Sequence, residues 1–332
     1  MKNYLSLSIQ NMQTAVEIYN AATRRGEQNY LLLSEEEFGQ LFLTPINEGD
    51  SVFAYYSENQ EGFIIGHFSG NLKRFFVTMI QVEPGSRRKG IGTALLETLR
   101  QEMKQFSIQH AIEMDALEIS YFNPVNITWE LPDTDGHRHP NSPGVRLGSP
   151  AHLFFKNMGF RDFSMQNSYH LELSAYEWPE EKLQPYTDKM SKAGYTVEFY
   201  DANKHSGMQD LVDDLNNDLW NYQIPAEMNR EGGPRPMLIV NDHGHVGGFA
   251  GPLVPDEHGR GFFLGIAIHS RCRGCGAATV LWNRLCLEFQ RAGAKYMTIF
   301  TAEDNHARSI YETAGFKIHA SWATMRRKEK KA

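Results

Sequence analysis

Hydrophobic and polar positions alternate along this chain in two stretches that repeat one order of elements. In the first stretch, short apolar runs bounded by polar turns predict strands, and apolar residues at helical spacing predict helices. One helix begins at Ser34 and has Glu37 three positions later, a pattern typical of a capped helix start. The predicted strands are residues 5–9, 52–56, 62–69, 75–82, 116–121 and 160–173, and the predicted helices are residues 11–24, 34–42, 91–105 and 151–158.

The second stretch follows a charged segment, residues 175–194, which we interpret as a linker. Within the second stretch, His243-Gly244-His245 predicts a hairpin turn. The first stretch is longer by roughly 28 residues near 122–150, rich in Pro, Asn, Asp, His and Gly, which predict a long ordered loop. The predicted strands of the second stretch are residues 196–200, 237–240, 245–249, 261–268 and 296–301, and its predicted helices are residues 276–292 and 306–314.

Composition narrows the class of protein. A length of 332 residues suits two domains of roughly 150 residues each. The net charge of −7 argues against wholesale nucleic-acid binding, which needs a basic face. No apolar stretch approaches the roughly 20 residues of a membrane span, and the first residues lack a signal-peptide layout, so we expect a cytoplasmic protein without membrane partners. Only the closing run, residues 326–331, resembles a low-complexity tail.

Two glycine-rich loops are the strongest repeat in the chain. They are Arg87-Arg88-Lys89-Gly90-Ile91-Gly92 and Arg271-Cys272-Arg273-Gly274-Cys275-Gly276, and an aromatic-x-x-x-Gly-Phe motif follows each, at Phe155 and at Tyr311. A strand that enters such a turn and leaves as a helix presents unpaired backbone N–H groups, which bind anions. The spacing fits neither the dinucleotide fingerprint nor the Walker loop. The sequence therefore predicts one phosphate-binding domain present twice.

These residues resemble the GNAT superfamily of acyl-CoA-dependent N-acyltransferases, whose loop motif is Val-x-Pro-x-x-Arg/Gln-x-x-Gly-x-Gly/Ala. The first copy matches from Val82 and Pro84 to Gly92, and the second is aligned from Ile266 to Gly276 without the proline. The family's second motif, Asn followed by Tyr-x-x-x-Gly-Phe, matches Asn305 and Tyr311, whereas the first copy has Phe155 in place of the tyrosine. The resemblance covers nearly the whole chain, in a tandem layout similar to that of mycothiol synthase and related two-domain acetyltransferases.

The resemblance implies an α+β fold in which a mixed, mostly antiparallel sheet is flanked by helices, with two tandem GNAT-like domains. We expect domains at residues 1–174, with the insertion near 122–150, and at residues 195–332, joined by residues 175–194. In each domain the fourth and fifth strands would splay apart. Acyl-CoA would enter the splay with its pyrophosphate on a glycine loop and its pantetheine arm along residues 266–268.

The implied co-substrate is acetyl-CoA, and the implied reaction is direct attack of a primary amine, of a small molecule or a peptide, on the thioester. Tyr311 is the expected proton donor to the leaving thiolate, which places activity in the second copy, although the first keeps the better glycine motif. Glu303 is the first candidate for the general base, with Asp304, Asp256, Glu257 and desolvation of the amine as alternatives. The resemblance assigns cofactor binding to Val82, Arg87, Arg88, Lys89, Gly90, Ile91, Gly92, Thr93, Ile266, Ile268, Arg271, Arg273, Gly274, Cys275, Gly276 and Asn305.

Several alternatives stay open on sequence alone. The chain could instead be a non-catalytic protein that senses acyl-CoA or assembles with a partner. Asp133, Asp135, His137 and His139 have metal-ligand types at short spacing, although exposed turns of this composition are common, and we assign no metal. Three cysteines are too few for a disulfide framework, and Cys272-x-x-Cys275 has no second pair to complete a metal site. The acceptor, the acyl chain length and the oligomeric state are not specified.

Overall fold

A computed structural model describes residues 4–120, 125–131, 134, 138–139 and 144–329. The chain forms two compact units. Unit 1 comprises Met1–Gln166 together with Ala320–Ala332, and unit 2 comprises Asn167–His319. Both units combine helices with mostly antiparallel sheet, so the predicted α+β class with two tandem domains of one fold is confirmed.

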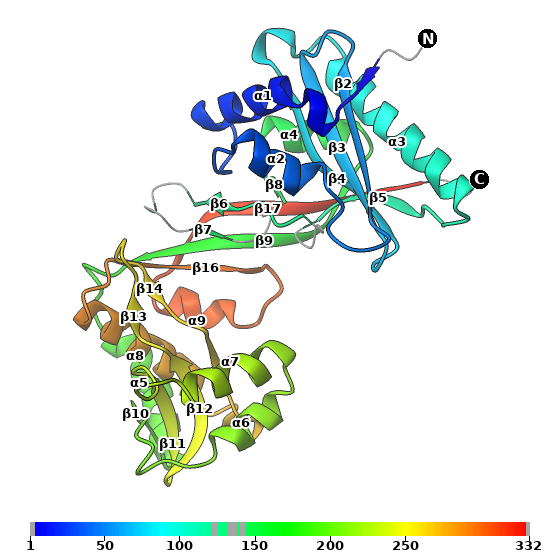
Figure 1. The fold of residues 1–332 in the computed structure, drawn as a ribbon. Helices are drawn as coiled ribbons and strands as arrows, with labels where there is room; N and C mark the ends of the chain where they lie inside the picture. Colours follow the sequence, from blue (N-terminus) through cyan, green and yellow to red (C-terminus); the bar gives the residue numbers. More distant parts are fainter. Residues whose placement is uncertain (1–3, 121–124, 132–133, 135–137, 140–143, 330–332) are drawn as a thin grey trace. The chain divides into compact units, whose positions relative to one another are not determined.

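Unit 1 contains a twisted sheet with helices on both faces (Figure 1). Helices α3 and α4 cover one face around Leu96 and Leu99, and α1 and α2 cover the other around Tyr19 and Phe38. Its helices are α1 (Gln13–Arg24), α2 (Glu35–Phe42), α3 (Ile91–Gln109) and α4 (Pro150–Asn157). Its strands are β1 (Tyr4–Ser6), β2 (Ser51–Ser57), β3 (Gly62–Ser69), β4 (Arg74–Val82), β5 (Ala116–Ile119), β6 (Trp129–Glu130), β7 (Arg138–His139) and β8 (Val145–Arg146).

Strands β1 to β4 are consecutive antiparallel neighbours, whereas β4 and β5 run parallel. The parallel pairing covers only Phe75 opposite Leu117 and Phe76 opposite Glu118. Beyond this point β4 continues to Val82 without a register partner in β5. The fourth and fifth strands therefore diverge toward the glycine loop, as the resemblance implied.

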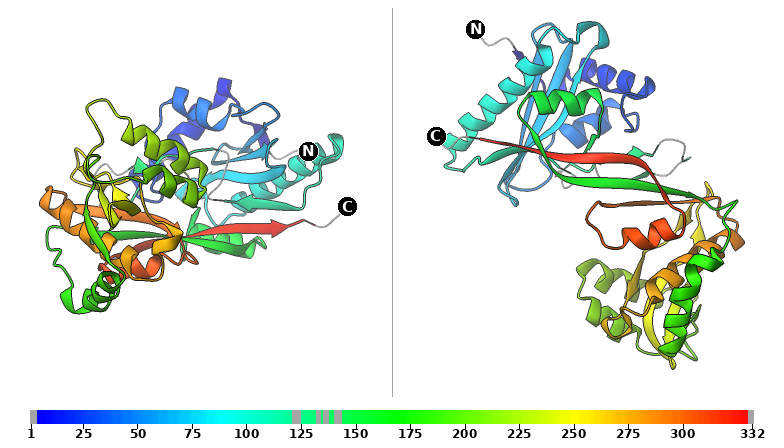
Figure 2. Two further views of the ribbon diagram at one scale, coloured as in Figure 1. Left: turned by 90° about the horizontal axis from the view of Figure 1, so that it is seen from below. Right: turned by 180° about the vertical axis from the view of Figure 1, so that it is seen from behind.

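Unit 2 repeats this plan with its own helices and strands, also seen in the two views of Figure 2. Its helices are α5 (Glu180–Lys192), α6 (Met208–Leu215), α7 (Asp218–Met228), α8 (Ala277–Arg291) and α9 (Arg308–Thr313). Its strands are β10 (Tyr195–Phe199), β11 (Leu238–Asp242), β12 (His245–Gly251), β13 (Val254–Pro255), β14 (Gly261–Phe262), β15 (Gly265–Ile268) and β16 (Tyr296–Ala302).

The splay is wider in unit 2. Strands β10, β11, β12 and β15 form an antiparallel sheet, and β16 belongs to another sheet. The fourth and fifth strands meet only at their start, where Arg260 forms a parallel bridge with Tyr296. Helix α8 packs on one face of β11, β12 and β15, and α6 and α7 pack on the other, around Leu211 and Phe249.

The last strand of each unit is supplied by the other half of the sequence. Strand β9 (Arg161–Glu172) begins in unit 1 and ends in unit 2, where Tyr169 and Leu171 join the core. Strand β17 (Lys317–Lys328) begins in unit 2 and ends in unit 1, where Met325 pairs with Ile119 of β5 and is fully buried. Each hydrophobic core therefore includes residues that are remote in sequence from the rest of its unit.

Several predictions about elements can now be judged. Ser34 Oγ accepts a hydrogen bond from Glu37 N at 3.2 Å, which confirms the capped helix start. The hairpin turn is also confirmed, since His243 and Gly244, both with positive φ, separate β11 from β12. The single strand predicted over residues 261–268 is wrong, because residues 263–264 interrupt it. The closing run is not a tail throughout, because residues 326–328 belong to β17.

Candidate functional site

The loop after β4 forms a nest of backbone donors at the N-terminus of α3. A short 3-10 turn, Pro84–Ser86, follows the strand, and Gly90 precedes the helix with φ 86°. No described residue accepts a hydrogen bond from the N–H groups of residues 88–92. These donors lie at the positive end of the helix dipole, and a phosphate group satisfies both conditions.

The three cations of this loop have different surroundings. Arg87 donates from Nε to the Val82 carbonyl at 2.8 Å and pairs with the Glu27 carboxylate at 2.6 Å, which holds the pKa of Glu27 below its usual value. Arg88 and Lys89 are exposed and form no ion pair within the described part of the chain. Arg87 therefore fixes the loop, while Arg88 and Lys89 are available to an anionic ligand.

The second loop has the same backbone path, but its register differs from the sequence alignment by two residues. Arg273, not Arg271, closes the 3-10 turn Ser270–Cys272 and donates from Nε to the carbonyl of Ile268, as Arg87 does to Val82. Gly276, with φ 88°, is the residue before α8 and so corresponds to Gly90. The predicted alignment of Arg271 with Arg87 is wrong, and the motif in unit 2 runs from Ile268 through Arg273 and Gly276 to Ala278.

Carboxylates surround this second loop. Arg271 pairs with Asp210 at 2.7 Å and with Asp242 at 3.0 Å. Asp214 accepts hydrogen bonds from the Ser270 hydroxyl and backbone N–H, which lower its pKa. Gly274 and the buried Cys275 occupy the positions of Arg88 and Lys89. The second loop keeps its unpaired N–H groups at residues 274–278 but has far less free positive charge than the first.

Tyr311 lies on α9 beside the splay of unit 2. Its ring centroid is 5.0 Å from that of Trp282 on α8, and Trp282 in turn lies 5.2 Å from Phe263 of the fourth-strand segment. Only 8% of Tyr311 is exposed, and this burial raises its pKa to about 12. Tyr311 therefore keeps its proton throughout the neutral range and can act as a donor but not as a base.

The remaining predicted residues of unit 2 lie near the end of β16. Asn305 is held by its own loop, because its amide donates to Thr301 Oγ1 at 2.7 Å and its oxygen accepts from Ala307 N at 2.9 Å. The Glu303 carboxylate forms no hydrogen bond or ion pair with any described residue, so none links it to Tyr311. In β15, Ile266 and Ile268 are partly buried against the core that contains Trp282.

Unit 1 differs from unit 2 at both of the positions that flank the splay. Phe155 stands where unit 2 has Tyr311, and it packs at 5.2 Å from Phe160. On the opposite face, Met79 is buried in one cluster with Val125 and Ile127 of the inserted segment. In unit 2 the strand position that matches Met79, three residues before the end of the strand, is Gly265. This strand position is therefore covered by the insertion in unit 1, whereas in unit 2 the indole of Trp220 lies against the glycine.

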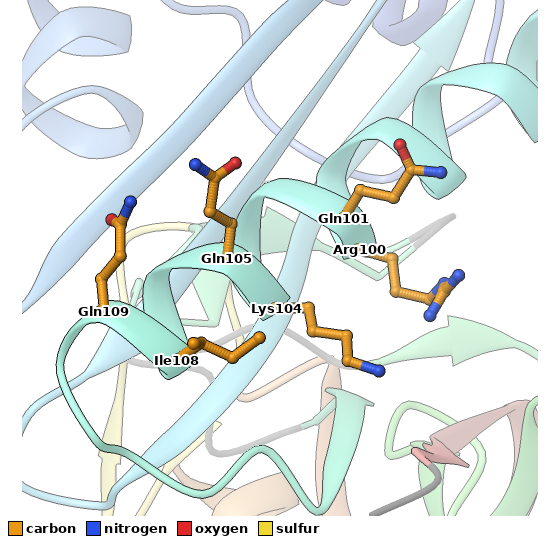
Figure 3. A pocket seen from close by; sticks show the side chains of 6 residues that line it. All are labelled: Arg100, Gln101, Lys104, Gln105, Ile108 and Gln109. Atoms are coloured by element: carbon orange, nitrogen blue, oxygen red, sulfur yellow. The ribbon is translucent and has the colours of Figure 1, made fainter. Parts of the chain in front are cut away.

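Other candidate sites receive no support. A surface depression on the outer face of α3 (Figure 3) begins more than about 10 Å along the helix from Gly90, and it is lined by Arg100, Gln101, Lys104, Gln105, Ile108 and Gln109. Within the described ranges no group of His, Cys, Asp or Glu could hold a metal ion. Asp133, Asp135 and His137 lie outside the described residues, as does the side chain of His139. No helix in the described part of the chain is long and apolar enough to span a membrane.

Sequence reasoning missed the residues that pack against these loops and against β15. Glu27, Asp210, Asp214 and Trp220 come from helices or turns far from the glycine loops in sequence, and none of them belongs to a local motif. Tyr186 of α5 is another, because its backbone lies 3.0 Å from where a Cβ on Gly276 would be. The repeat itself gave one usable signal, since Met79 and Gly265 occupy matching positions after the register is corrected.

Comparison with known proteins agrees with this geometry. The model of the acetyltransferase (GNAT) family matches residues 14–121 and again residues 195–316. Among solved structures, a GCN5-related N-acetyltransferase from Sphaerobacter thermophilus has a TM-score of 0.54 at 13% identity, covering 99% of this chain and 96% of that one. A tandem GNAT protein from the clavulanic acid biosynthesis pathway has a TM-score of 0.50 at 16% identity, covering 99% of each chain. A search of curated proteins gave no match.

Proposed function

The chain belongs to the acetyltransferase (GNAT) family, and on that premise we propose that unit 2 transfers an acetyl group from acetyl-CoA to a primary amine. The observation that carries this proposal is the wide splay between β15 and β16, which opens beside the helix N-terminus at Gly276 and beside Tyr311. The acceptor would be the amine of a small molecule or a peptide. Acyl transfer as a class follows from the family, whereas the donor and acceptor are proposals.

The residues of unit 2 divide the binding of acetyl-CoA between them. Backbone N–H groups at 274–278 would hold the pyrophosphate, with glycines at 274 and 276 giving close access to the main chain. The free edge of β15 at Ile266 and Ile268 would pair with the pantetheine arm as an added strand does. Acetyl-CoA supplies the activated thioester, and the protein supplies position and protons.

Tyr311 would donate the proton that the departing thiolate needs. A phenol of pKa about 12 gives its proton to a thiolate of ordinary pKa about 8.5 only at a cost of about 5 kcal/mol in water. The burial that raises the pKa of Tyr311 also disfavours a thiolate placed against the same aromatic cluster, so the two values move in the same direction. No described partner identifies Glu303 as the base, and desolvation of the amine is the alternative.

The test is release of free thiol from acetyl-CoA in the presence of a panel of primary amines. We expect amine-dependent thiol release, with one acetylated amine formed per thiol. A protein that binds acetyl-CoA in calorimetry yet releases no thiol with any amine would overturn the enzymatic proposal. Tyr311→Phe removes the donor and keeps the ring, so it separates the proton-transfer role from packing.

A second candidate function applies to unit 1 and rests on its filled acceptor side. Its loop has the unpaired N–H groups and two free cations, whereas Phe155 cannot donate a proton and Met79 packs with Val125 and Ile127. We propose that unit 1 binds acyl-CoA without turning it over. Titration calorimetry would then give two molecules of acetyl-CoA per chain, and Arg88→Ala/Lys89→Ala would weaken one of them. A single site insensitive to this double substitution would contradict the proposal.

A further inference from the structure

Trp220 of α7 lies directly on the fourth strand of unit 2. A Cβ built on Gly265 would lie 2.9 Å from Cζ2 of the indole and 3.2 Å from its Nε1. No side chain other than hydrogen fits at position 265 with the indole in this place. The edge of the ring that carries the N–H group is therefore packed against the backbone of β15 on the face covered by α6 and α7.

The indole is held from its other side by the core. Its ring meets Phe249 of β12 edge to face, with centroids 6.0 Å apart and planes at 84°. The backbone N–H of Trp220 donates to Asn217 Oδ1 at 3.2 Å, which fixes the first turn of α7. These contacts define one position for the ring. Trp220 is nevertheless only partly buried, so one part of it faces solvent.

The N–H group of this indole has no hydrogen-bond partner in the part of the chain that the structure describes. Among the described residues none accepts a hydrogen bond from Trp220 Nε1, and the atom is not enclosed, in contrast to the buried Nε1 of Trp282. An indole is a donor only, so whatever meets this group must offer an acceptor atom. A fixed donor that is not fully enclosed, beside a glycine in a strand, is a feature that a ligand can use.

The position of this donor relates it to the acceptor of the proposed reaction. If the pantetheine arm runs from the loop back along Ile268 and Ile266, the next residue toward the acyl end is Gly265. The face with α8 and Tyr311 is then on the CoA side, and Trp220 lies on the opposite face, from which the second substrate would approach. At the corresponding position of unit 1, Met79 packs with the insertion, so unit 1 has no indole beside its fourth strand among the described residues.

We infer that Trp220 selects primary amines that carry a hydrogen-bond-accepting oxygen, such as an ether, hydroxyl or carbonyl, a few bonds from the nitrogen. This inference rests on the proposed transfer in unit 2 and goes beyond it by naming the acceptor class. Trp220 would be a specificity-determining residue, because a donor left without an acceptor on binding disfavours the analogue that lacks the oxygen.

The experiment compares 2-methoxyethylamine with n-butylamine, which differ in that oxygen. We expect kcat/KM to favour the ether amine in the wild type, and we expect this preference to fall about tenfold in Trp220→Phe, which loses one hydrogen bond. The difference in basicity between the two amines is the same for both proteins and cancels. KM for acetyl-CoA should stay unchanged. Tyr222→Phe is the matched control, because Tyr222 lies on the same helix and is 75% exposed.

A ratio unchanged in Trp220→Phe, with turnover retained, would overturn the inference and leave the proposed function intact. If Trp220→Phe is inactive, Gly265→Ala provides a second test. Its methyl group collides with the indole and displaces the N–H group, so it should raise KM for the ether amine alone. Equal effects on both amines would count against the inference. If the wild type releases no thiol at all, the proposed function fails, and equilibrium binding of the two amines in the presence of CoA then decides the inference by the same ratio.

Discussion

Met325→Ala tests whether the C-terminal strand completes the N-terminal unit. Met325 is fully buried in the core of unit 1, and it pairs with Ile119 of β5. Truncating a buried Met to Ala removes transfer free energy and leaves a cavity, which costs about 2–5 kcal/mol. We expect a loss near the middle of this range, about 3 kcal/mol, because neighbouring Ala323 is too small to fill the space.

The readout must separate the two units. For a unit of this size, about 3 kcal/mol lowers the melting temperature by roughly 6–12 °C. Hydrogen exchange followed by mass spectrometry should show faster exchange in β3 and β4, which lie more than 200 residues before the substitution. Ile318→Ala is the matched control, because Ile318 lies on the same strand, within unit 2, and is 48% exposed. We expect it to change stability by less than about 0.5 kcal/mol.

One result would refute the reasoning outright. If Met325→Ala leaves exchange in β3 and β4 unchanged while segments of unit 2 lose protection, the end of β17 does not belong to unit 1. Equal destabilisation by Ile318→Ala would point to a general effect of the strand, and the argument from burial would fail. Either finding would also remove the support for a core that two distant segments share.

Four further predictions follow from the site and the core. Tyr311→Phe should lower kcat at least tenfold, measured by thiol release, with little change in the affinity for CoA measured by calorimetry. An unchanged kcat would exclude the proton-donor role. Arg88→Ala/Lys89→Ala should weaken one CoA site roughly 30-fold at low salt and less at high salt, with Lys104→Ala as the charge control on α3. Burial lowers the pKa of His67 to about 4, so as pH falls below about 6.5 the unfolded state binds a proton and the folded state does not. The free energy of unfolding of unit 1 should therefore fall by about 2 kcal/mol between pH 7 and pH 5. Urea titrations of His67→Phe should show that this dependence on pH is lost. Ser34→Ala should cost about 1 kcal/mol through loss of the cap, measured by thermal melting, and no change would show that the cap is not limiting.

The structural features that depend on local sequence pattern could be predicted from the sequence. The alternating runs around Gly62–Ser69 and the Ser34 cap lie where they were predicted, and the repeated glycine loops identified a tandem fold. The register of the second loop could not be predicted, because Arg271-x-x-Gly274-x-Gly276 and Arg273-x-x-Gly276-x-Ala278 both satisfy the motif. What distinguishes them is the bond from Arg273 to the Ile268 carbonyl and the left-handed Gly276 before α8, and both are properties of the folded backbone.

The contacts that matter most for the site are remote in sequence. Glu27 reaches Arg87, Asp210 reaches Arg271, and Trp220 reaches Gly265, and no local periodicity signals any of these pairs. The two helices α6 and α7 were not predicted, because their Asp- and Asn-rich sequence resembles loops. The crossing of β9 and β17 between units was not predicted either, since strand pairing depends on partners that the strand's own residues do not specify.

The crossing of β17 sets the order in which the protein can be made. Unit 1 begins at the N-terminus, yet Ala323 and Met325 leave the ribosome about 160 residues after Gln166, which is roughly 10–30 s of synthesis. During that interval the outer edge of β5 lacks its strand partner, and such edges pair with other chains. The half that is made first is completed last, and the time it spends unfinished is the time needed to translate unit 2.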